Sequence, residues 1–220
     1  MAGLGIGPGE FAIFGIRDPG QRAQALEAVV TPALSRIGRE LVDGLARVTG
    51  AALLLQAARP LRRRGPATSE VLVAFCPAEG GCRTAPYLAL AASRSQLHAR
   101  VAVRAAADRG GTMRRALERE AASLARKGKP FRKLRSYAGW DGEQLPEIAP
   151  AHATAFWIEL AAELIPDRNA NGGIDVGVAW SVEEARSLGI GDVLGAFRDL
   201  APIYKLLSSA VPGAPSIASR

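Results

Sequence analysis

The amino-acid sequence predicts one α+β domain built on a mainly antiparallel sheet with flanking helices. The apolar run Val71–Cys76 is typical of a buried strand. The segments Pro86–Ser93 and Leu97–Ala105 are separated by only three residues, which favours a hairpin. Apolar residues alternate with small or polar ones along Ile174–Trp180, as they do in a half-buried strand. Because helical segments precede, interrupt and follow these strands without strict alternation, we expect antiparallel pairing.

A long amphipathic helix is predicted near the start of the chain. Asp18 is a suitable N-cap, and Pro19 suits the first helical turn. Apolar residues then recur at steps of three or four, and this stripe comprises Leu26, Val30, Leu34, Ile37, Leu41, Leu45 and Val48. Pro32 interrupts the stripe, so we expect two helices or one kinked helix, with Gly50 as a left-handed cap. The preceding residues 3–9 lack the context of a phosphate loop and are predicted to be a flexible lead-in.

The second half of the chain adds helices and one more strand. The expected elements are a helix capped by Thr112 and running to about Lys127, a strand at Phe131–Trp140, a helix at Ala151–Ile165, and a last helix that opens at Asp192 and is interrupted at Pro202. Ser181 and Glu184 have the spacing of a capping box. In the strand Ile174–Trp180, the side chains of Asp175 and Gly177 are expected to face away from the core.

Length and composition are those of an ordinary globular protein. The chain has 220 residues, of which 48% are hydrophobic and 22% charged, and this excludes global disorder and coiled coil. We expect residues 1–208 to form one domain and residues 209–220 a frayed tail. No apolar run approaches the roughly 20 residues that span a bilayer, and the start has no signal-peptide pattern. A cytoplasmic protein without a membrane partner or a cofactor is therefore expected.

The charges are unevenly distributed along the chain. The first 140 residues carry 23 basic and 10 acidic side chains, and the last 80 carry 5 and 11, so the two parts have net charges of +13 and −6. This asymmetry is consistent with an anion-binding half, or with two parts that attract each other in the fold.

Several arginines are candidates to line an anion-binding cleft. The densest basic run lies at residues 59–64. Along the strand Leu97–Ala105, side chains alternate, so His98, Arg100 and Arg104 share one face. Guanidinium groups bind phosphate and carboxylate in a bidentate manner, and aromatic rings stack on bases. The predicted ligand-binding residues are Arg59, Arg62, Tyr87, His98, Arg100, Arg104 and Asp175, with Trp140 as a second stacking ring.

The alternative is that these arginines are paired inside the protein. Two guanidinium groups on one strand face repel each other unless an anion or a carboxylate lies between them. The carboxylates available for such ion pairs are Glu159, Glu163, Asp175 and Asp192. Structural ion pairs of this kind resemble binding sites in sequence, so both interpretations remain open.

The cysteines and histidines are few. Cys76 and Cys82 lie six positions apart, a spacing that does not match a zinc site, and we expect no metal and a reduced, buried Cys76. Free cysteines are most often simply buried. Catalysis would need a nucleophile, a base and an acid to converge. The candidate nucleophiles are Cys82, Ser93 and Ser95, the candidate base is His98, and the candidate acid is Asp175. The positive charges next to His98 disfavour its protonated form, and His152 is expected at the surface.

Several short motifs resemble the YktB-like family of uncharacterised bacterial proteins. They are Phe11–Ile16, Arg22, Pro32 and Ile37-Gly38 in the following helix, Ala58-Arg59, Val73-Ala74-Phe75, Pro86-Tyr87, Val176-Gly177 and Leu200–Tyr204. The resemblance implies a single α+β domain whose sheet is similar to the core of class II synthetases and biotin ligases. It implies no catalytic residue, because the family has no established activity.

Two functional hypotheses follow from the sequence, besides a structural or partner-binding protein in which the acidic C-terminal third would matter more. The first is a binding module for an anionic ligand, either nucleotide-like or single-stranded nucleic acid, which uses the arginine-lined cleft. The second is a small-molecule transferase or ligase-like enzyme that uses the same cleft and also needs an acid–base or nucleophilic group.

Overall fold

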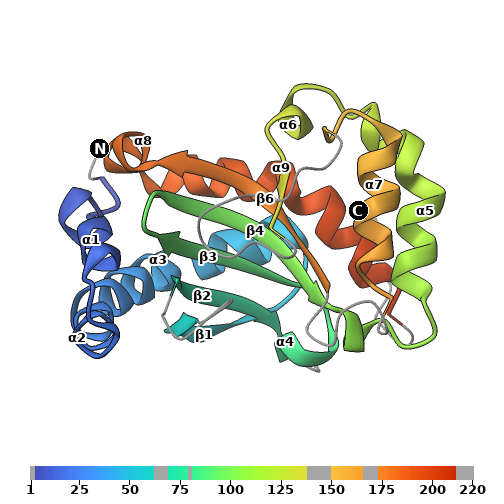
Figure 1. The fold of residues 1–220 in the computed structure, drawn as a ribbon. Coiled ribbons are helices and arrows are strands. Elements are labelled where there is room, and N and C mark those ends of the chain that lie inside the picture. Colours follow the sequence, from blue (N-terminus) through green and yellow to red (C-terminus); the bar gives the residue numbers. More distant parts are fainter. Residues whose placement is uncertain (1–2, 62–68, 79–80, 138–149, 166–172, 212–220) are drawn as a thin grey trace.

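The computed structural model describes residues 3–61, 69–78, 81–137, 150–165 and 173–211. At its centre is a six-stranded sheet with the order β1-β2-β3-β4-β6-β5, and each neighbouring pair is antiparallel (Figure 1). The strands are β1 (Leu53–Leu61), β2 (Glu70–Pro77), β3 (Tyr87–Ser93), β4 (Gln96–Arg104), β5 (Arg135–Ser136) and β6 (Gly173–Ser181). The predicted α+β class, the β3–β4 hairpin and the strand status of residues 71–76 and 174–180 are confirmed.

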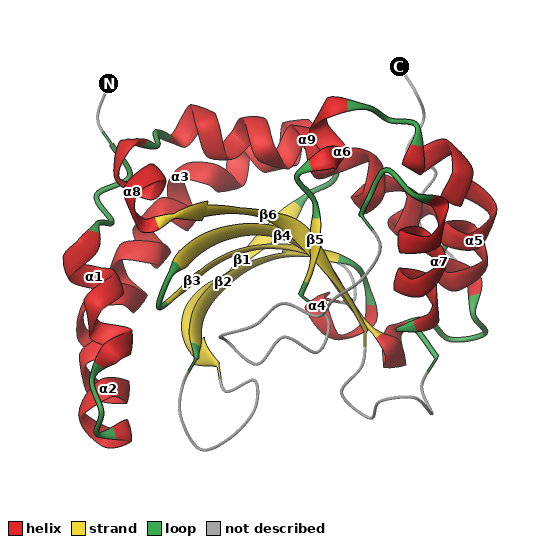
Figure 2. Ribbon diagram, turned by 45° about the horizontal axis from the view of Figure 1, so that its top comes forward, coloured by secondary structure: helices red, strands yellow, loops and turns green. Residues whose placement is uncertain are grey.

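Helices flank this sheet. They are α1 (Pro8–Ala12), α2 (Pro19–Ala25), α3 (Thr31–Thr49), α4 (Gly81–Thr84), α5 (Thr112–Ala125), α6 (Lys129–Arg132), α7 (Thr154–Ala162), α8 (Val182–Ser187) and α9 (Ile190–Ser209). Helices α3 and α9 lie over one face of the sheet, whereas α5 and α7 pack together beyond one end of it (Figure 2). None of the helices in the described part of the chain is both long and apolar enough to cross a bilayer.

The main core lies between the sheet and the two long helices. The residues of β2, β3 and β4 that face α3 and α9 have almost no exposed surface, and they include Val73, Phe75, Leu90, Ala99 and Val101. The predicted apolar stripe of α3 is buried against them, since Leu34, Ile37, Leu41 and Leu45 are fully buried. This burial is the main source of stability, at roughly 1.5–3 kcal/mol for each large aliphatic side chain.

The first long helical segment bends without breaking at Pro32. The side chain of Asp18 accepts from the Gln21 amide at 2.7 Å, which confirms the predicted cap. Between α2 and α3 lies one π-helical turn, Leu26–Val30. The proline ring crowds the carbonyl four residues before it, and a wider turn here relieves that crowding. Gly50 ends α3 with a φ of 74°, the expected left-handed cap.

Residues 59–61, part of the densest basic run, belong to the end of β1, whose pairing with β2 supplies their backbone bonds. Three expectations about local structure are wrong. Residues 3–9 are not a flexible lead-in, because Leu4 is buried and its amide donates to the carbonyl of Leu188 at 2.9 Å. Pro202 does not interrupt α9, since the buried residues around it hold the helix to the core. The cap of α5 is not Thr112: Asp108 accepts from the amides of Met113 and Arg114.

The segment predicted as a strand at Phe131–Trp140 differs most from expectation. Its first two residues are helical and belong to α6, because Pro130 is pre-organised for a first helical turn. Arg135–Ser136 pairs with β6, the Tyr137 amide donates to the Asp175 carbonyl at 2.6 Å, and residues 138–140 lie outside the described residues. Two other predictions agree more closely with the structure. Ser181 and Glu184 form the predicted capping box, and the helix expected at residues 151–165 is the shorter α7.

Candidate functional site

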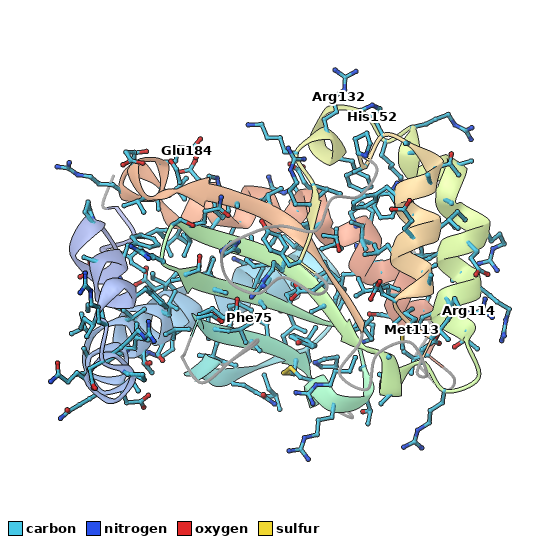
Figure 3. All side chains as sticks on the ribbon, viewed as in Figure 1. Phe75, Met113, Arg114, Arg132, His152 and Glu184 are labelled. Carbon is cyan, nitrogen blue, oxygen red and sulfur yellow. A yellow bond between two sulfur atoms is a disulfide. The ribbon has the colours of Figure 1, made fainter. Side chains whose placement is uncertain are left out.

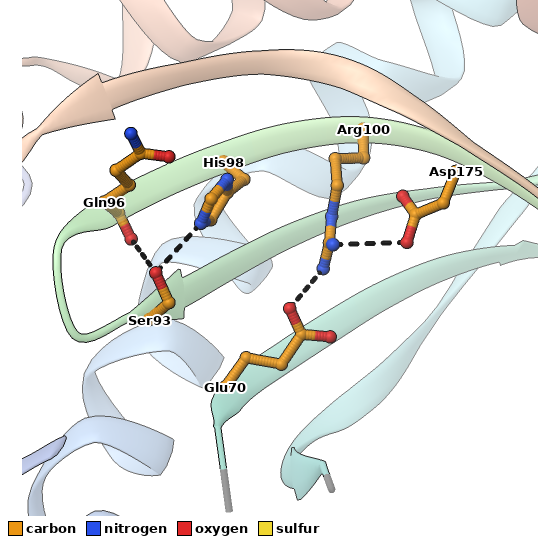
Figure 4. A network of polar contacts seen from close by, with 6 residues as sticks. All are labelled: Glu70, Ser93, Gln96, His98, Arg100 and Asp175. Atoms are coloured by element: carbon orange, nitrogen blue, oxygen red, sulfur yellow. Dashed lines mark hydrogen bonds and ion pairs between the residues drawn. The ribbon is translucent and has the colours of Figure 1, made fainter. Parts of the chain in front are cut away.

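The sheet face opposite α3 and α9, which we call the polar face, gathers charged and polar side chains from neighbouring strands. Glu70 comes from β2, Ser93 from β3, His98 and Arg100 from β4, and Asp175 from β6 (Figure 4). Glu70 lies opposite Ser93 in the β2–β3 register. Because side chains alternate along a strand, the register that buries the apolar core also collects these groups on the other side.

Arg100 is the centre of this group. Its Nη2 donates to Oε2 of Glu70 at 2.9 Å, and its Nη1 donates to Oδ2 of Asp175 at 3.2 Å. The side chains of Arg100 and Glu70 have no exposed surface, and that of Asp175 is 14% exposed. Two carboxylates and one guanidinium give this triad a net charge of −1 when all three are ionised. Removing one member of such a buried set typically costs about 3–5 kcal/mol, because another charge is left uncompensated.

One donor of Arg100 is not used by the triad. Its Nε–H is buried and meets no hydrogen-bond acceptor among the described residues. A buried donor in that state costs about 1–3 kcal/mol, and such donors are rare in native proteins. The guanidinium therefore retains capacity for an acceptor that lies outside the described residues, for example on a water molecule or a ligand.

Small residues make room for the arginine. Gly177 is the register partner of Arg100 on β6, and Ala89 is its partner on β3. A Cβ on Gly177 would lie 2.0 Å from the carbonyl oxygen of Ala99 and 2.8 Å from Cγ of Arg100. Only glycine allows β6 to approach β4 this closely, so the backbone of β6 permits the position of the Arg100 side chain.

His98 and Ser93 form a second contact on the polar face. Ser93 Oγ lies 3.1 Å from His98 Nε2 and 3.3 Å from the carbonyl oxygen of Gln96. The ring of Tyr137 meets His98 edge to face at a centroid distance of 4.9 Å, and its centroid lies 5.3 Å from Cζ of Arg100. All of these side chains are buried. The one hydroxyl proton of Ser93 has two uses: donated to Gln96, it leaves His98 as the donor and ties the β3–β4 turn together; donated to His98, it gives the geometry of a base-activated nucleophile.

Tyr137 is held in its neutral form. Burial raises the pKa of its hydroxyl well above the ordinary value of 10.0, and the nearby positive charge of Arg100 offsets part of that shift. The phenol therefore stays protonated at neutral pH and is a hydrogen-bonding group rather than a charge. It adds no charge to the polar face.

The structure brings together only part of the predicted ligand-binding set. Tyr87, His98, Arg100 and Asp175 lie on the polar face, and Tyr87 is half-buried opposite Ala102. Arg104 is exposed at the end of β4, two alternations beyond Arg100.

For the remaining predicted residues, Arg59, Arg62 and Trp140, the structure describes either the backbone alone or nothing. The backbone of Arg59 pairs with Leu72, whereas Arg62 and Trp140 lie outside the described residues. Of the four carboxylates considered as internal partners, Asp175 alone pairs with an arginine in the described part of the chain.

The cysteines correct a prediction. Cys76 is buried as expected, but it is not reduced: it forms a disulfide with Cys82, the yellow bond in Figure 3. Spacing alone could not reveal this, because the bond depends on α4 folding back toward the end of β2. The disulfide anchors α4 beside the polar face, where Cys82 and Tyr87 pack against Leu72 and Ala74. Cys82 is therefore not a free nucleophile, and Ser95 is exposed in the turn.

A cavity of about 340 Å³ lies away from the polar face. It is lined by Thr112, Arg115, Ala116, Arg119, Ser209 and Ala210. The hydroxyl of Thr112 already donates to Asp108, and that of Ser209 to the carbonyl of Leu206. The cavity thus offers two exposed arginines on α5 and no uncommitted hydroxyl donor. His152 is exposed, as expected, and projects outward in Figure 3.

Sequence reasoning missed Glu70 and Tyr137. Glu70 directly precedes the apolar run of β2, and alternation places it on the same side as Leu72 and Ala74. An acidic residue at the start of a fully buried strand was the available signal. Tyr137 had no such signal, because it lies in a segment whose strand was predicted too long.

Comparison with known proteins adds a family match. A model described as "Domain of unknown function (DUF1054)" matches residues 8–145. That range contains β1 to β5 and therefore Glu70, Ser93, His98, Arg100 and Tyr137, whereas Asp175 lies beyond it. A search of curated proteins gives no match.

Proposed function

The chain belongs to the DUF1054 family of domains of unknown function, and we propose that it is a binding module for an anionic ligand held at the exposed end of the polar face. The resemblance of its motifs to the YktB-like proteins suggests that name for it. Two further parts of the proposal come from the sequence: a cytoplasmic location, and a sheet similar to the core of class II synthetases and biotin ligases.

The observation that carries the proposal is the contrast between Arg100 and Arg104. Arg100 is buried, and each of its two Nη atoms is paired with a carboxylate. Arg104 is exposed, and no carboxylate lies within ion-pair distance of it among the described residues. Its neighbour on β6 is Gly173, which contributes no side chain. The anionic group therefore binds Arg104, whereas Arg100 helps to shape the face.

Two neighbouring groups support this position. The half-buried ring of Tyr87 lies on β3 opposite Ala102, between the levels of Arg100 and Arg104. Helix α4, which carries the exposed Arg83, packs against β4 and is anchored by the disulfide. A second guanidinium on a helix that packs against β4, and an aromatic ring on the neighbouring strand, are components that bind a phosphorylated molecule or a strand of nucleic acid.

The test is a titration of the purified protein with pyrophosphate, a nucleoside monophosphate and a short single-stranded oligonucleotide. We expect at least one probe to bind, with an affinity that falls as salt rises. Arg104→Gln should weaken binding by roughly tenfold, since a hydrogen bond to a charged group contributes about 1.5–3 kcal/mol. The matched control is Arg198→Gln, an exposed arginine on α9, which should leave binding unchanged.

Two outcomes would overturn the proposal. One is that none of the probes binds. The other is that binding survives Arg104→Gln but is lost when Arg115 and Arg119 are both replaced by Gln, because the anion would then occupy the cavity between α5 and α9.

One contact favours a second candidate function, a transferase or ligase-like enzyme. Ser93 Oγ and His98 Nε2 are within hydrogen-bond distance, as a nucleophile and its general base would be. Labelling with a serine-directed phosphonate tests it. Labelling of the protein but not of a Ser93→Ala variant would support catalysis, and the absence of labelling would argue against it.

A further inference from the structure

We propose that α5 presents an arginine stripe that binds the phosphate backbone of double-stranded DNA. The stripe consists of the exposed residues along one side of α5 and its C-cap, which are Arg115, Arg119, Ala122, Ser123 and Arg126. This inference goes beyond the proposed function, because it assigns a second surface, away from the polar face, and a macromolecular partner.

The segment that carries the stripe holds the excess positive charge of the protein. Residues 109–135 contain 10 basic and 2 acidic side chains, a net charge of +8, whereas the full chain has a net charge of +7. The rest of the chain is therefore close to neutral. Such a local excess attracts polyanions and raises their rate of association. Helix α5 lies at the outer edge of the molecule in both Figure 1 and Figure 2, where a large partner can reach it.

Helical periodicity builds the stripe. Steps of three or four residues place its side chains on one side of α5, opposite the buried face of the helix. Arg115 and Arg119 lie one turn apart, where like charges repel each other. Among the described residues, Arg115 and Arg126 have no carboxylate at ion-pair distance, and Nε of Arg119 has only Oε1 of its neighbour Glu120, at 3.5 Å. A partner with closely spaced negative charges relieves the repulsion within the stripe.

The long helix α3 has a different surface. Its exposed charges alternate in sign, since Asp43 lies four residues from both Arg39 and Arg47. Opposite charges at this spacing attract each other within the helix and need no external partner. Arg39 and Arg47 are therefore a charge-matched control for the two arginines of the stripe.

A cavity borders the stripe on the side of α9. It has a volume of about 340 Å³, and its lining includes Arg115 and Arg119 together with Ser209 and Ala210 from the end of α9. The carbonyl end of a helix is partly negative, so a phosphate group is favoured beside the arginines and disfavoured against α9. This geometry favours an extended polyanion that runs along α5 over a small anion enclosed in the cavity.

The dimensions and composition of the stripe favour duplex DNA. Arg115 and Arg126 lie 11 positions apart, a rise of about 16 Å along a helix axis. B-form DNA carries one phosphate charge for about every 1.7 Å of its axis, so about ten phosphates lie along that length. The stripe contains no aromatic ring, the group on which single-strand binding surfaces stack bases. The wide major groove of B-form DNA admits a helix, whereas that of double-stranded RNA is too narrow.

The experiment is a titration of the full chain with short fluorescent DNA duplexes of two unrelated sequences, at several salt concentrations. We expect both duplexes to bind equally, because phosphate contacts carry no sequence information. Arg115→Gln/Arg119→Gln should weaken binding at least tenfold at low salt. It should also lower the slope of log Kd against log salt by about 2, since each phosphate contact contributes about 0.9 to that slope. The control Arg39→Gln/Arg47→Gln, which loses the same charge, should leave the slope unchanged.

Two further variants give independent readouts. Arg115→Lys/Arg119→Lys keeps both positive charges and should keep the salt slope. Arg126→Gln, at the end of the helix, should lower the slope by about 1. This single variant decides if the double glutamine variant does not fold.

Several results would overturn the inference. One is that the duplexes do not bind, and another is that the stripe and control variants weaken binding equally, because overall charge would then be responsible. Tighter binding of double-stranded RNA, or of vesicles rich in phosphatidylserine, would assign the stripe to a different partner. None of these results bears on anion binding at Arg104, which is measured with pyrophosphate. Failure of pyrophosphate to bind would in turn leave the DNA titration as it stands.

Discussion

Gly177 lies opposite Arg100 across the β4–β6 pair, and a side chain at that glycine would occupy the space of the Arg100 stem. The position of the buried guanidinium therefore depends on a residue with no side chain, on a strand more than 70 positions away in the sequence. This relationship links the sheet register to the geometry of the polar face, and it predicts which substitutions the face tolerates.

Gly177→Ala should destabilise the protein severely. The added Cβ would lie 2.0 Å from the backbone oxygen of Ala99, so β4 and β6 would have to separate. Overpacking typically costs about 1–3 kcal/mol and more where backbone must move. Chemical denaturation measures the change. The control is Gly195→Ala in α9, where a Cβ meets nothing within 4 Å and stability should rise by up to about 1 kcal/mol. A neutral result for Gly177→Ala would contradict the described packing.

Arg100→Ala and Arg104→Ala should differ sharply in stability. Removal of Arg100 deletes its ion pairs with the buried Glu70 and with Asp175, at a cost of about 3–5 kcal/mol. Removal of the exposed Arg104 should change the free energy of unfolding by less than about 0.5 kcal/mol. Urea denaturation without ligand makes the comparison. Equal destabilisation by both substitutions would mean that Arg104 also has an internal partner.

Reduction of the Cys76–Cys82 disulfide should lower thermal stability. The bond closes a loop of only a few residues, for which the chain-entropy model gives a stabilisation of about 2 kcal/mol. A melting curve with and without dithiothreitol should show the loss, whereas a Cys76→Ala/Cys82→Ala variant should be indifferent to the reductant. Because α4 carries Arg83 next to the polar face, reduction should also weaken binding of the pyrophosphate probe. An unchanged melting temperature would show that the bond contributes nothing.

Stability should fall steeply in alkali because of Tyr137. Its folded pKa is raised above the ordinary 10.0, so above that pH the unfolded chain releases a proton that the folded chain retains. The unfolded state then binds fewer protons, and the free energy of unfolding decreases by up to about 1.4 kcal/mol per pH unit for this group. Burial raises the pKa of Tyr204 in the same direction. Tyr137→Phe should make the decline shallower between pH 10 and 12, as measured by urea denaturation. An identical slope in that variant would contradict the assignment.

Local pattern was sufficient for most elements of this fold. The alternation along Ile174–Trp180, the close spacing of the β3 and β4 segments, and the caps at Asp18, Gly50 and Ser181 all depend on residues within a few positions of each other. Side-chain alternation and capping are short-range effects, so the sequence determined them alone. It also placed His98 and Arg100 on one face of a strand, and Asp175 on the face of another strand that points away from the core.

The tertiary structure decided what those faces do. Glu70 reaches Arg100 from 30 positions away and Asp175 from 75, and only the β2-β3-β4-β6 order puts all three within hydrogen-bond distance. The same holds for the disulfide, which needs α4 to fold back, and for α9, which runs through Pro202 because its neighbours are buried. Hydrophobic periodicity specifies which side of a strand is buried, whereas the pairing register between distant strands specifies which polar groups meet. That register is a property of the whole sheet, and so the ion pairs of Arg100 emerge only in the folded protein.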